Sequence, residues 1–203
     1  TSGRQAIHAV RRGRVAMNTG GSSVAATSTT HPDDGSMRIR ALSHSDLADV
    51  ARIQRECYGH GFIESVDSFA AKLAANAEFS FLATRQNVAV GYAVAFPWAF
   101  GEIPALNGLE YSIPPNADSL YIHDIAVVPT ARGTGTARLL LDTVLSTARS
   151  KGYRRAFLVA VQGGAAYWRR HGFEPVPHDE KLARYLAAYG EGAVCMTSVD
   201  ETG

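Results

Sequence analysis

The chain is poor in cysteine, has no long apolar segment and carries no excess of either charge. Its 203 residues include two cysteines, Cys57 and Cys195, which lack the spacing of a Cys-x-x-Cys pair. Two cysteines are too few for a disulfide framework, so we expect reduced thiols in a cytoplasmic protein, with one remote disulfide as the alternative. No uninterrupted apolar run reaches the roughly 18 residues of a membrane-spanning helix, so no membrane partner is expected.

Lysine and arginine number 20, against 19 aspartate and glutamate residues. A protein that follows nucleic-acid backbones normally has a clear basic excess, so we expect no nucleic-acid partner. Hydrophobic residues make up 46% and charged residues 19%, which is typical of a folded globular protein, and the length suits one domain with a hydrophobic core. Glycine, by contrast, is plentiful, with 19 residues.

Residues 1–36 differ in composition from the rest. They hold four arginines, two acidic residues, the run Gly20-Gly21-Ser22-Ser23 and almost no large apolar side chain. Such a segment cannot bury enough apolar surface to offset its chain entropy, which predicts a disordered N-terminal extension. A plain tail or translated leader is the favoured interpretation, with a transit peptide as the alternative. The folded domain is expected to span residues 37–203.

From Met37 onward, hydrophobic periodicity predicts alternating strands and helices. The sequence Ser43-His44-Ser45-Asp46 is a capping box ahead of the first helix. A tight turn is expected at 85–87, and the long connection 97–118 is of a length that is usually functional. The order predicts a single α/β (α+β) domain with a mixed sheet, antiparallel early and with a parallel crossover later. Strands are expected at 38–40, 78–84, 88–96, 120–128, 156–161 and 193–199, and helices at 47–57, 65–76, 135–151, 165–171 and 182–188.

A glycine-rich turn follows the central strand 120–128 and begins the helix 135–151. The first N–H groups of a helix lack internal partners and lie at the positive end of its dipole, so they bind anions. Gly133 and Gly135 would let a phosphate approach the backbone, and Arg132 adds a cation. A Walker loop would need Gly-Lys-Ser/Thr, and a dinucleotide fingerprint a third glycine where Arg138 stands, so neither motif fits. A turn with glycines for geometry alone remains the alternative.

The residues around this turn resemble the GNAT superfamily of N-acetyltransferases. The run 132–137, Arg-Gly-Thr-Gly-Thr-Ala, fits the Arg/Gln-x-x-Gly-x-Gly/Ala loop that holds the pyrophosphate of coenzyme A in that superfamily. Ile125-Ala126-Val127 is similar to its strand-4 element, and the run 165–173, which ends in Gly-Phe, is similar to its second motif. The resemblance covers about 165 residues and implies a sheet splayed between strands 4 and 5.

Membership of that family implies acetyl-CoA as co-substrate and no metal. The backbone of residues 125–127 would pair with the pantetheine arm like an added strand, with the N–H of Ile125 directed at the thioester oxygen. The sequence offers no His/Cys cluster with metal-ligand spacing. The residues expected to bind the cofactor are Ile125, Ala126, Val127, Arg132, Gly133, Thr134, Gly135, Thr136, Ala137 and Trp168.

Two catalytic residues are expected, a base and an acid. By strand alternation Tyr121, His123 and Ile125 share one face, which places His123 beside the reacting acetyl group, and its ordinary pKa of about 6.5 suits a base. Asp124 is expected on the opposite face, as a carboxylate that pairs with backbone. The acid of the family is often a tyrosine at the position of Trp168, whose indole cannot transfer a proton. Tyr167 is therefore the candidate acid, with Tyr121 or water as alternatives.

The acceptor site is expected between the segment 57–64 and the loop 97–118. Their aromatic residues predict an amphipathic pocket, and three acids could attract an amine. The sequence thus predicts an N-acetyltransferase acting on a primary amine, favouring a small molecule, and leaves room for a homodimer. A catalytically silent acetyl-CoA-binding module and a different nucleotide-binding α/β protein are the alternatives. The aromatic residues are Tyr58, Phe62, Trp98, Phe100 and Tyr111, and the acids are Glu64, Glu102 and Glu110.

Overall fold

The computed structural model describes residues 36–58, 62–177 and 179–200. The predicted N-terminal extension lies almost entirely outside these residues, so its disorder stays a prediction. Within the described ranges, no helix is both long and apolar enough to cross a bilayer.

The described residues form one mixed sheet of seven strands in the order β1-β2-β3-β4-β5-β7-β6. The pair β4–β5 is parallel and the other five pairs are antiparallel, which confirms the predicted mixed, mostly antiparallel sheet. The two residues of β6 were not predicted, because so short a strand cannot show an alternating pattern. The strands are β1 (Met37–Ala41), β2 (Phe81–Arg85), β3 (Val88–Trp98), β4 (Ser119–Val127), β5 (Arg155–Ala160), β6 (Glu174–Pro175) and β7 (Val194–Val199).

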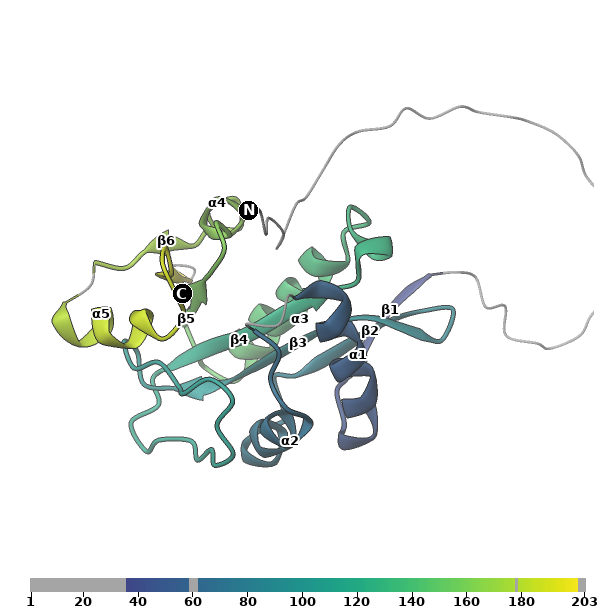
Figure 1. Cartoon of the computed structure of the whole chain (residues 1–203), viewed down its shortest axis with the longest axis horizontal. Helices are drawn as coiled ribbons and strands as arrows, with labels where there is room; N and C mark the ends of the chain where they lie inside the picture. The colour runs from purple at the N-terminus through teal and green to yellow at the C-terminus, as the bar shows by residue number, and fades with distance from the viewer. Residues whose placement is uncertain (1–35, 59–61, 178, 201–203) are drawn as a thin grey trace, which may run out of the picture.

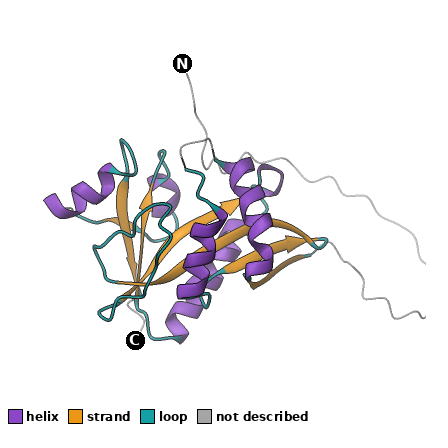
Figure 2. Cartoon of the chain, turned by 60° about the horizontal axis from the view of Figure 1, so that its bottom comes forward, coloured by secondary structure: helices purple, strands orange, loops and turns teal. Residues whose placement is uncertain are grey.

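Helices cover both faces of the sheet (Figures 1 and 2). Phe69 of α2 packs edge-on against Tyr92 of β3, with 5.8 Å between ring centroids. The preceding residue, Gly91, faces α3 on the other side, where an added methyl group would lie 3.4 Å from Leu140. The helices are α1 (Leu47–Cys57), α2 (Val66–Ala75), α3 (Thr136–Ser150), α4 (Ala165–Arg169) and α5 (Glu180–Ala187), with 3₁₀ turns at η1 (His44–Asp46) and η2 (Pro129–Ala131).

Local sequence signals explain where the early elements begin and turn. The Asp46 carboxylate accepts the backbone N–H of Ser43 at 2.9 Å and an Arg40 guanidinium N–H at 2.6 Å, so the predicted capping box precedes α1. The turn between β2 and β3 consists of Gln86 and Asn87, with φ of 50° and 58°, one residue fewer than predicted. Two consecutive positive φ angles match the twist of a hairpin.

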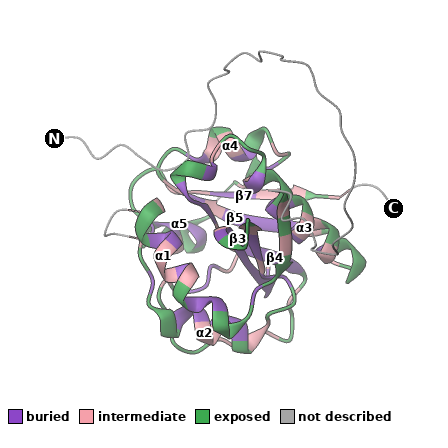
Figure 3. Cartoon of the chain, turned by 90° about the vertical axis from the view of Figure 1, so that its right-hand side faces the viewer, coloured by how far each residue is buried: buried purple, intermediate pink, exposed green. Residues whose placement is uncertain are grey.

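The central strands form the core. In Figure 3 much of β3, β4, β5 and β7 is buried, while the helices present exposed faces to solvent. Phe96, Tyr121 and Phe157 are each at most 1% exposed. The rings of Tyr121 and Phe157, on β4 and β5, lie 5.0 Å apart and hold these two strands together at one end.

A bulge interrupts β4 in its middle. Val94 of β3 pairs with Asp124, but the next residue, Ala95, pairs with Ile122, so His123 is the extra residue of β4. A bulge bends its strand and re-aims its side chains. Asp124 consequently reaches the same side as His123, and the prediction by alternation of opposite faces is wrong. The Asp124 carboxylate contacts Tyr92, whose ring packs on Phe69, and Phe69 also contacts the His123 ring.

The bulge coincides with the divergence of β4 and β5. These strands pair only at Leu120–Ala156 and Tyr121–Phe157. Beyond that point β5 stays paired with β7, while β4 continues along β3 to Val127. In the described structure, the edge of β4 from Ile122 onward therefore has no strand partner on the β5 side. This is the splay between the fourth and fifth strands that the resemblance to the GNAT superfamily implied.

Candidate active site

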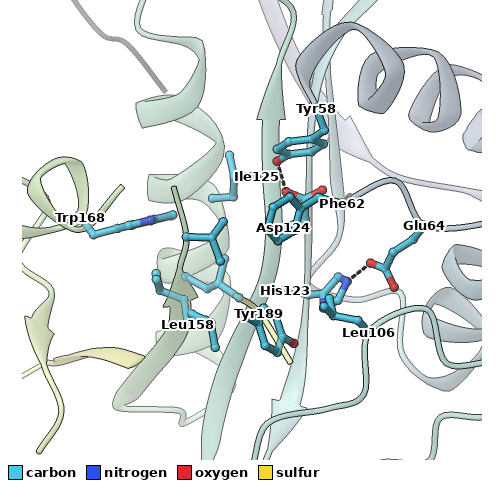
Figure 4. Close-up of a pocket in the computed structure, with 13 residues that line it drawn as sticks. Tyr58, Phe62, Glu64, Leu106, His123, Asp124, Ile125, Leu158, Trp168 and Tyr189 are labelled. Atoms are coloured by element: carbon cyan, nitrogen blue, oxygen red, sulfur yellow. Dashed lines mark hydrogen bonds and ion pairs between the residues drawn. The ribbon is translucent and has the colours of Figure 1, made fainter. Parts of the chain in front are cut away.

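A cleft opens where β4 and β5 separate (Figure 4). It encloses about 740 Å³ of empty space, including the part open to solvent. Strand β4 forms one wall with four consecutive residues, and Tyr58, Phe62 and Glu64, which lie between α1 and α2 in the chain, line one side. The lining residues are Ile122, His123, Asp124 and Ile125 of β4; Leu158, Val159, Val161 and Trp168 from β5 through α4; Tyr58, Phe62, Glu64 and Leu106; and Tyr189.

The glycine-rich loop follows β4 at the end where the strands are apart. Gly133 and Gly135 have φ of 76° and 85°, a left-handed conformation that favours glycine, and beyond the adjoining backbone no atom lies within 4 Å of where a β-carbon would stand. Thr134 donates its hydroxyl to the Ala131 carbonyl at 2.7 Å, which closes the turn onto η2. The space above the turn that begins α3 is therefore open, which suits a phosphate, while Arg132 Nε lies 3.4 Å from the Val127 carbonyl oxygen.

His123 projects from the bulge and is held by Glu64. Its Nε2 is hydrogen-bonded to the Glu64 carboxylate, and its ring stacks on Phe96 with centroids 6.0 Å apart. The Glu64 carboxylate also accepts from Lys72 Nζ at 2.8 Å. Burial alone would raise the pKa of Glu64, but the His123 hydrogen bond and the charges of His123 and Lys72 outweigh it and hold that pKa well below its usual range. Glu64 is thus ionised, and accepts from its neighbours.

Asp124 is the second carboxylate of the cleft and is held by two tyrosines. It accepts the hydroxyl of Tyr58 at 2.5 Å and the hydroxyl of Tyr92. Burial raises the pKa of Asp124, although the two hydrogen bonds oppose the rise. The expected pairing with backbone is therefore wrong: the carboxylate ties the end of α1 to the sheet through side chains.

Trp168 and Tyr167 are adjacent in α4 and their rings are in edge-to-face contact, 5.3 Å between centroids, but their other contacts differ. Trp168 points toward the gap between β4 and β5 and rests on Phe173, with ring centroids 5.3 Å apart (Figure 4). The Tyr167 ring instead packs 4.5 Å from that of His171, near Arg170. Burial raises the pKa of Tyr167, with Arg138 and Arg170 opposing. Among the described lining residues of the cleft, Trp168 is present and Tyr167 is not.

A tyrosine that the sequence reasoning missed lies in the cleft. Tyr189, just after α5, lines it beside Leu158 (Figure 4). Its hydroxyl donates to the Pro104 carbonyl at 3.1 Å and lies 3.3 Å from the Tyr121 hydroxyl. Burial raises the pKa of Tyr189 to about 12. Only the tertiary fold brings this residue, 68 positions after Tyr121, to the cleft.

The residues predicted for the acceptor side divide into two groups. Tyr58, Phe62 and Glu64 line the cleft, whereas from the loop after β3 the described lining residue is Leu106. The other aromatic residues pack on the core: Trp98 and Tyr111 on Phe96, and Phe100 on Phe157. Glu102 pairs with Lys181 at 3.1 Å and Glu110 is exposed, so Glu64 is the predicted acid that reaches the cleft.

Lys72 could have been found from the helical pattern. It lies three residues after Phe69 and directly before Leu73, both buried, so it shares the buried face of α2. A lysine on such a face requires a buried acidic partner.

No group of three or more His, Cys, Asp or Glu side chains within the described ranges could hold a metal ion.

The sequence also matches a known family. The model of the acetyltransferase (GNAT) family matches residues 47–173, which is more than half of the chain. The chain therefore belongs to the GNAT acetyltransferase family, as the motifs predicted. No curated protein matches the sequence at a significant level.

Solved structures support the same fold. The loading GNATL domain of CurA from Lyngbya majuscula is 10% identical, with a TM-score of 0.66 over 83% of this chain and 100% of that chain. The ribosomal-protein-S18-alanine N-acetyltransferase from Escherichia coli is 18% identical, with a TM-score of 0.57 over 83% and 96%. The putative acetyltransferase yncA from Salmonella typhimurium, solved with acetyl-CoA, is 18% identical, with a TM-score of 0.59 over 82% and 95%.

Proposed function

We propose that this protein is an N-acetyltransferase that moves the acetyl group of acetyl-CoA to the primary amine of a small molecule. The observation that carries the proposal is the unpaired edge of β4 beside the buried His123, in a cleft that follows from the splay of β4 and β5. The similar fold of a structure solved with acetyl-CoA supports the choice of co-substrate. A cytoplasmic location and a homodimer remain predictions.

The chain offers acetyl-CoA two sets of backbone groups. The unpaired edge of β4 at Ile125, Ala126 and Val127 would hydrogen-bond the pantetheine arm as an added strand does. The loop 133–137 would hold the pyrophosphate with its N–H groups, and Arg132 would add charge. The indole of Trp168 would pack on the arm from the opposite wall, where it lines the cleft.

Direct attack of the amine on the thioester needs no metal and moves two protons. His123 accepts one proton from the ammonium form of the acceptor, and the freed nitrogen lone pair forms the C–N bond at the carbonyl carbon. A strand N–H, that of Ile125, stabilises the resulting oxyanion. The C–S bond then breaks, the nitrogen loses its second proton, and the thiolate gains one. The balance is an amide, free coenzyme A and one released proton.

The acceptor side of the cleft favours a small amine with an apolar body. Its walls there are Tyr58, Phe62 and Leu106. The two carboxylates nearby are already engaged, Glu64 by Lys72 and His123, and Asp124 by tyrosine hydroxyls. A polyamine would need several free acidic groups, which the described residues of this part of the cleft do not supply.

Release of coenzyme A thiol across a panel of primary amines tests the proposal. We expect turnover with small aryl or alkyl amines above that with polyamines. Binding of acetyl-CoA without turnover of any amine would instead support the catalytically silent module, and failure to bind at millimolar concentration would contradict both.

The base is tested separately by His123→Ala. We expect kcat/KM at pH 7 to fall by about 100-fold or more, which is the usual contribution of general-base catalysis. The Kd for acetyl-CoA should stay unchanged, because the backbone binds it. His44→Ala, at an exposed histidine, is the matched control. Equal rates for wild type and His123→Ala across pH 6–9 would remove His123 from the role.

A further inference from the structure

Glu64 lies at the centre of a buried charged cluster. The exposed fractions of the side chains are 8% for Glu64, 2% for His123 and 0% for Lys72. Besides the bonds from His123 and Lys72, Glu64 accepts from the Ser68 hydroxyl at 3.1 Å and from the backbone N–H of Asn107 at 2.6 Å. Lys72 donates in turn to the Ser68 hydroxyl at 2.6 Å. Burying a charged pair this completely costs desolvation free energy, so we looked for a functional role of the pair.

We infer that Glu64 and Lys72 are positioning residues that fix the proton arrangement of His123. Glu64 holds the imidazole ring with a hydrogen on Nε2, which leaves Nδ1 as the atom that accepts a proton. The negative charge of Glu64 favours the protonated ring, and the positive charge of Lys72 limits that effect. The role of His123 as a base rests on the proposed function, but the effect of Glu64 and Lys72 on the protonation of its ring does not.

The tautomer follows from the hydrogen bonds. An ionised carboxylate can only accept, so the hydrogen between Glu64 and His123 belongs to Nε2. In a neutral ring the other nitrogen, Nδ1, then carries a lone pair. His123 Nδ1 is buried and has no hydrogen-bond partner within the described part of the chain. Because it has no partner and its side chain lines the cleft, Nδ1 is assigned as the ring atom that takes the proton of an acceptor amine once the amine is bound.

The charge balance around the ring assigns a role to Lys72. A lone carboxylate bonded to Nε2 would stabilise the imidazolium and keep the proton on it. Lys72 Nζ, 2.8 Å from the same carboxylate, offsets part of that attraction. Its ammonium is further held 4.6 Å from the Tyr111 ring centroid.

Among the described residues, further titratable groups near His123 lie in four parts of the chain, one of which is Tyr58 at the end of α1, bonded to Asp124. Tyr121 and Asp124 lie on β4, Tyr189 follows α5, and Tyr111 lies in the loop after β3. Burial raises the pKa of Tyr121 and of Tyr189, which keeps both neutral at neutral pH. Asp124 is a second carboxyl group, common to every variant considered below. Differences among variants at residues 64 and 72 therefore report on Glu64 and Lys72.

Opposite shifts of the His123 pKa distinguish this role from a merely structural one. Lys72→Met leaves Glu64 unopposed and should raise the pKa of His123 by about one unit, whereas Glu64→Gln should lower it by about as much. A structural pair would reduce stability and activity alike at every pH in both variants. Lys151→Met removes the same charge from an exposed pair with Glu78 and is the matched control, with no shift expected.

The pKa is measured by NMR titration of the histidine Cε1–H signals of the full chain, labelled with ¹³C, with His123 assigned from its absence in His123→Gln. Glu64→Gln leaves Lys72 buried without a counter-charge and can unfold. The double variant Glu64→Gln/Lys72→Met removes both charges and should abolish the upward shift seen in Lys72→Met. Shifts in the same direction, an upward shift that persists in the double variant, or ¹⁵N signals of an Nδ1–H tautomer would overturn the inference. The titration requires no turnover, so its result tests the inference even if the protein has no acetyltransferase activity.

Discussion

We propose that the hydroxyl of Tyr189, which donates to the Pro104 carbonyl in this structure, turns to protonate a departing thiolate. The departing sulfur needs a proton donor in the cleft, and Trp168, which stands where the family often has a tyrosine, cannot supply one. Tyr189 lines the cleft, and its hydroxyl lies 3.3 Å from that of Tyr121, a second tyrosine that could return the proton. Its pKa of about 12 keeps it protonated over the whole neutral range.

Tyr189→Phe should therefore lower kcat by about tenfold or more without changing the Kd for acetyl-CoA. Because Tyr189 does not titrate near neutrality, the loss should be equal across pH 6–9, in contrast to the pH-dependent loss in His123→Ala. Steady-state rates over that range check the prediction. Tyr167→Phe is the comparison, since Tyr167 packs against His171. A loss in Tyr167→Phe with none in Tyr189→Phe would return the acid to α4.

Single residues were predictable from the sequence only where local pattern determines their position. Alternation and the family motif placed His123 in strand 120–128, and the structure puts it in the cleft. The same alternation placed Asp124 wrongly, because a bulge leaves no mark in the hydrophobic pattern. Glu64 was one of three acids of equal standing, and Tyr189 was not considered, because each reaches the cleft through contacts distant in sequence.

At the scale of elements, the turn between β4 and α3 carries the cofactor assignment. Its glycines are needed for their positive φ and for the open space above them. Both requirements were predictable, because a strand, a Gly-x-Gly turn and a helix follow one another within a short stretch. The contribution of the loop 99–118 was less predictable. Most of its aromatic side chains pack on the core, and length and composition do not distinguish core packing from a binding site.

Gly135→Val should abolish coenzyme A binding while leaving the protein folded. A β-branched residue at φ 85° is strained by about 1 kcal/mol or more, and its side chain would occupy the space above the turn. Gly152→Val is the control, because Gly152, just beyond the other end of α3, has φ 88° and the same open surroundings. Isothermal titration with coenzyme A and urea unfolding separate the two effects. Equal affinity of the two variants would contradict the assignment of the loop.

At the scale of the whole molecule, the sheet consists of two parts that meet at one end. Strands β1 to β4 form one antiparallel part and β5 to β7 the other, with two paired positions between them. The cleft lies in this gap, so anything that pairs with the free edge of β4 and contacts the wall at Leu158 and Trp168 would join the two parts. A ligand that binds only the folded state adds RT ln(1 + [L]/Kd) to the free energy of unfolding, about 2.7 kcal/mol at 100 times Kd.

Coenzyme A should therefore stabilise the molecule unevenly, and hydrogen exchange can locate where. Backbone N–H groups between Ile122 and Val127 that lack a partner in β3 should exchange more slowly when coenzyme A is bound, because they would gain hydrogen bonds. The β2–β3 hairpin, which is paired along its length apart from one bulge, serves as the internal reference, and Gly135→Val should show no protection at either place. Slower exchange along the hairpin but not along β4 would mean that the ligand binds outside the gap, and the placement of the pantetheine arm would then be wrong.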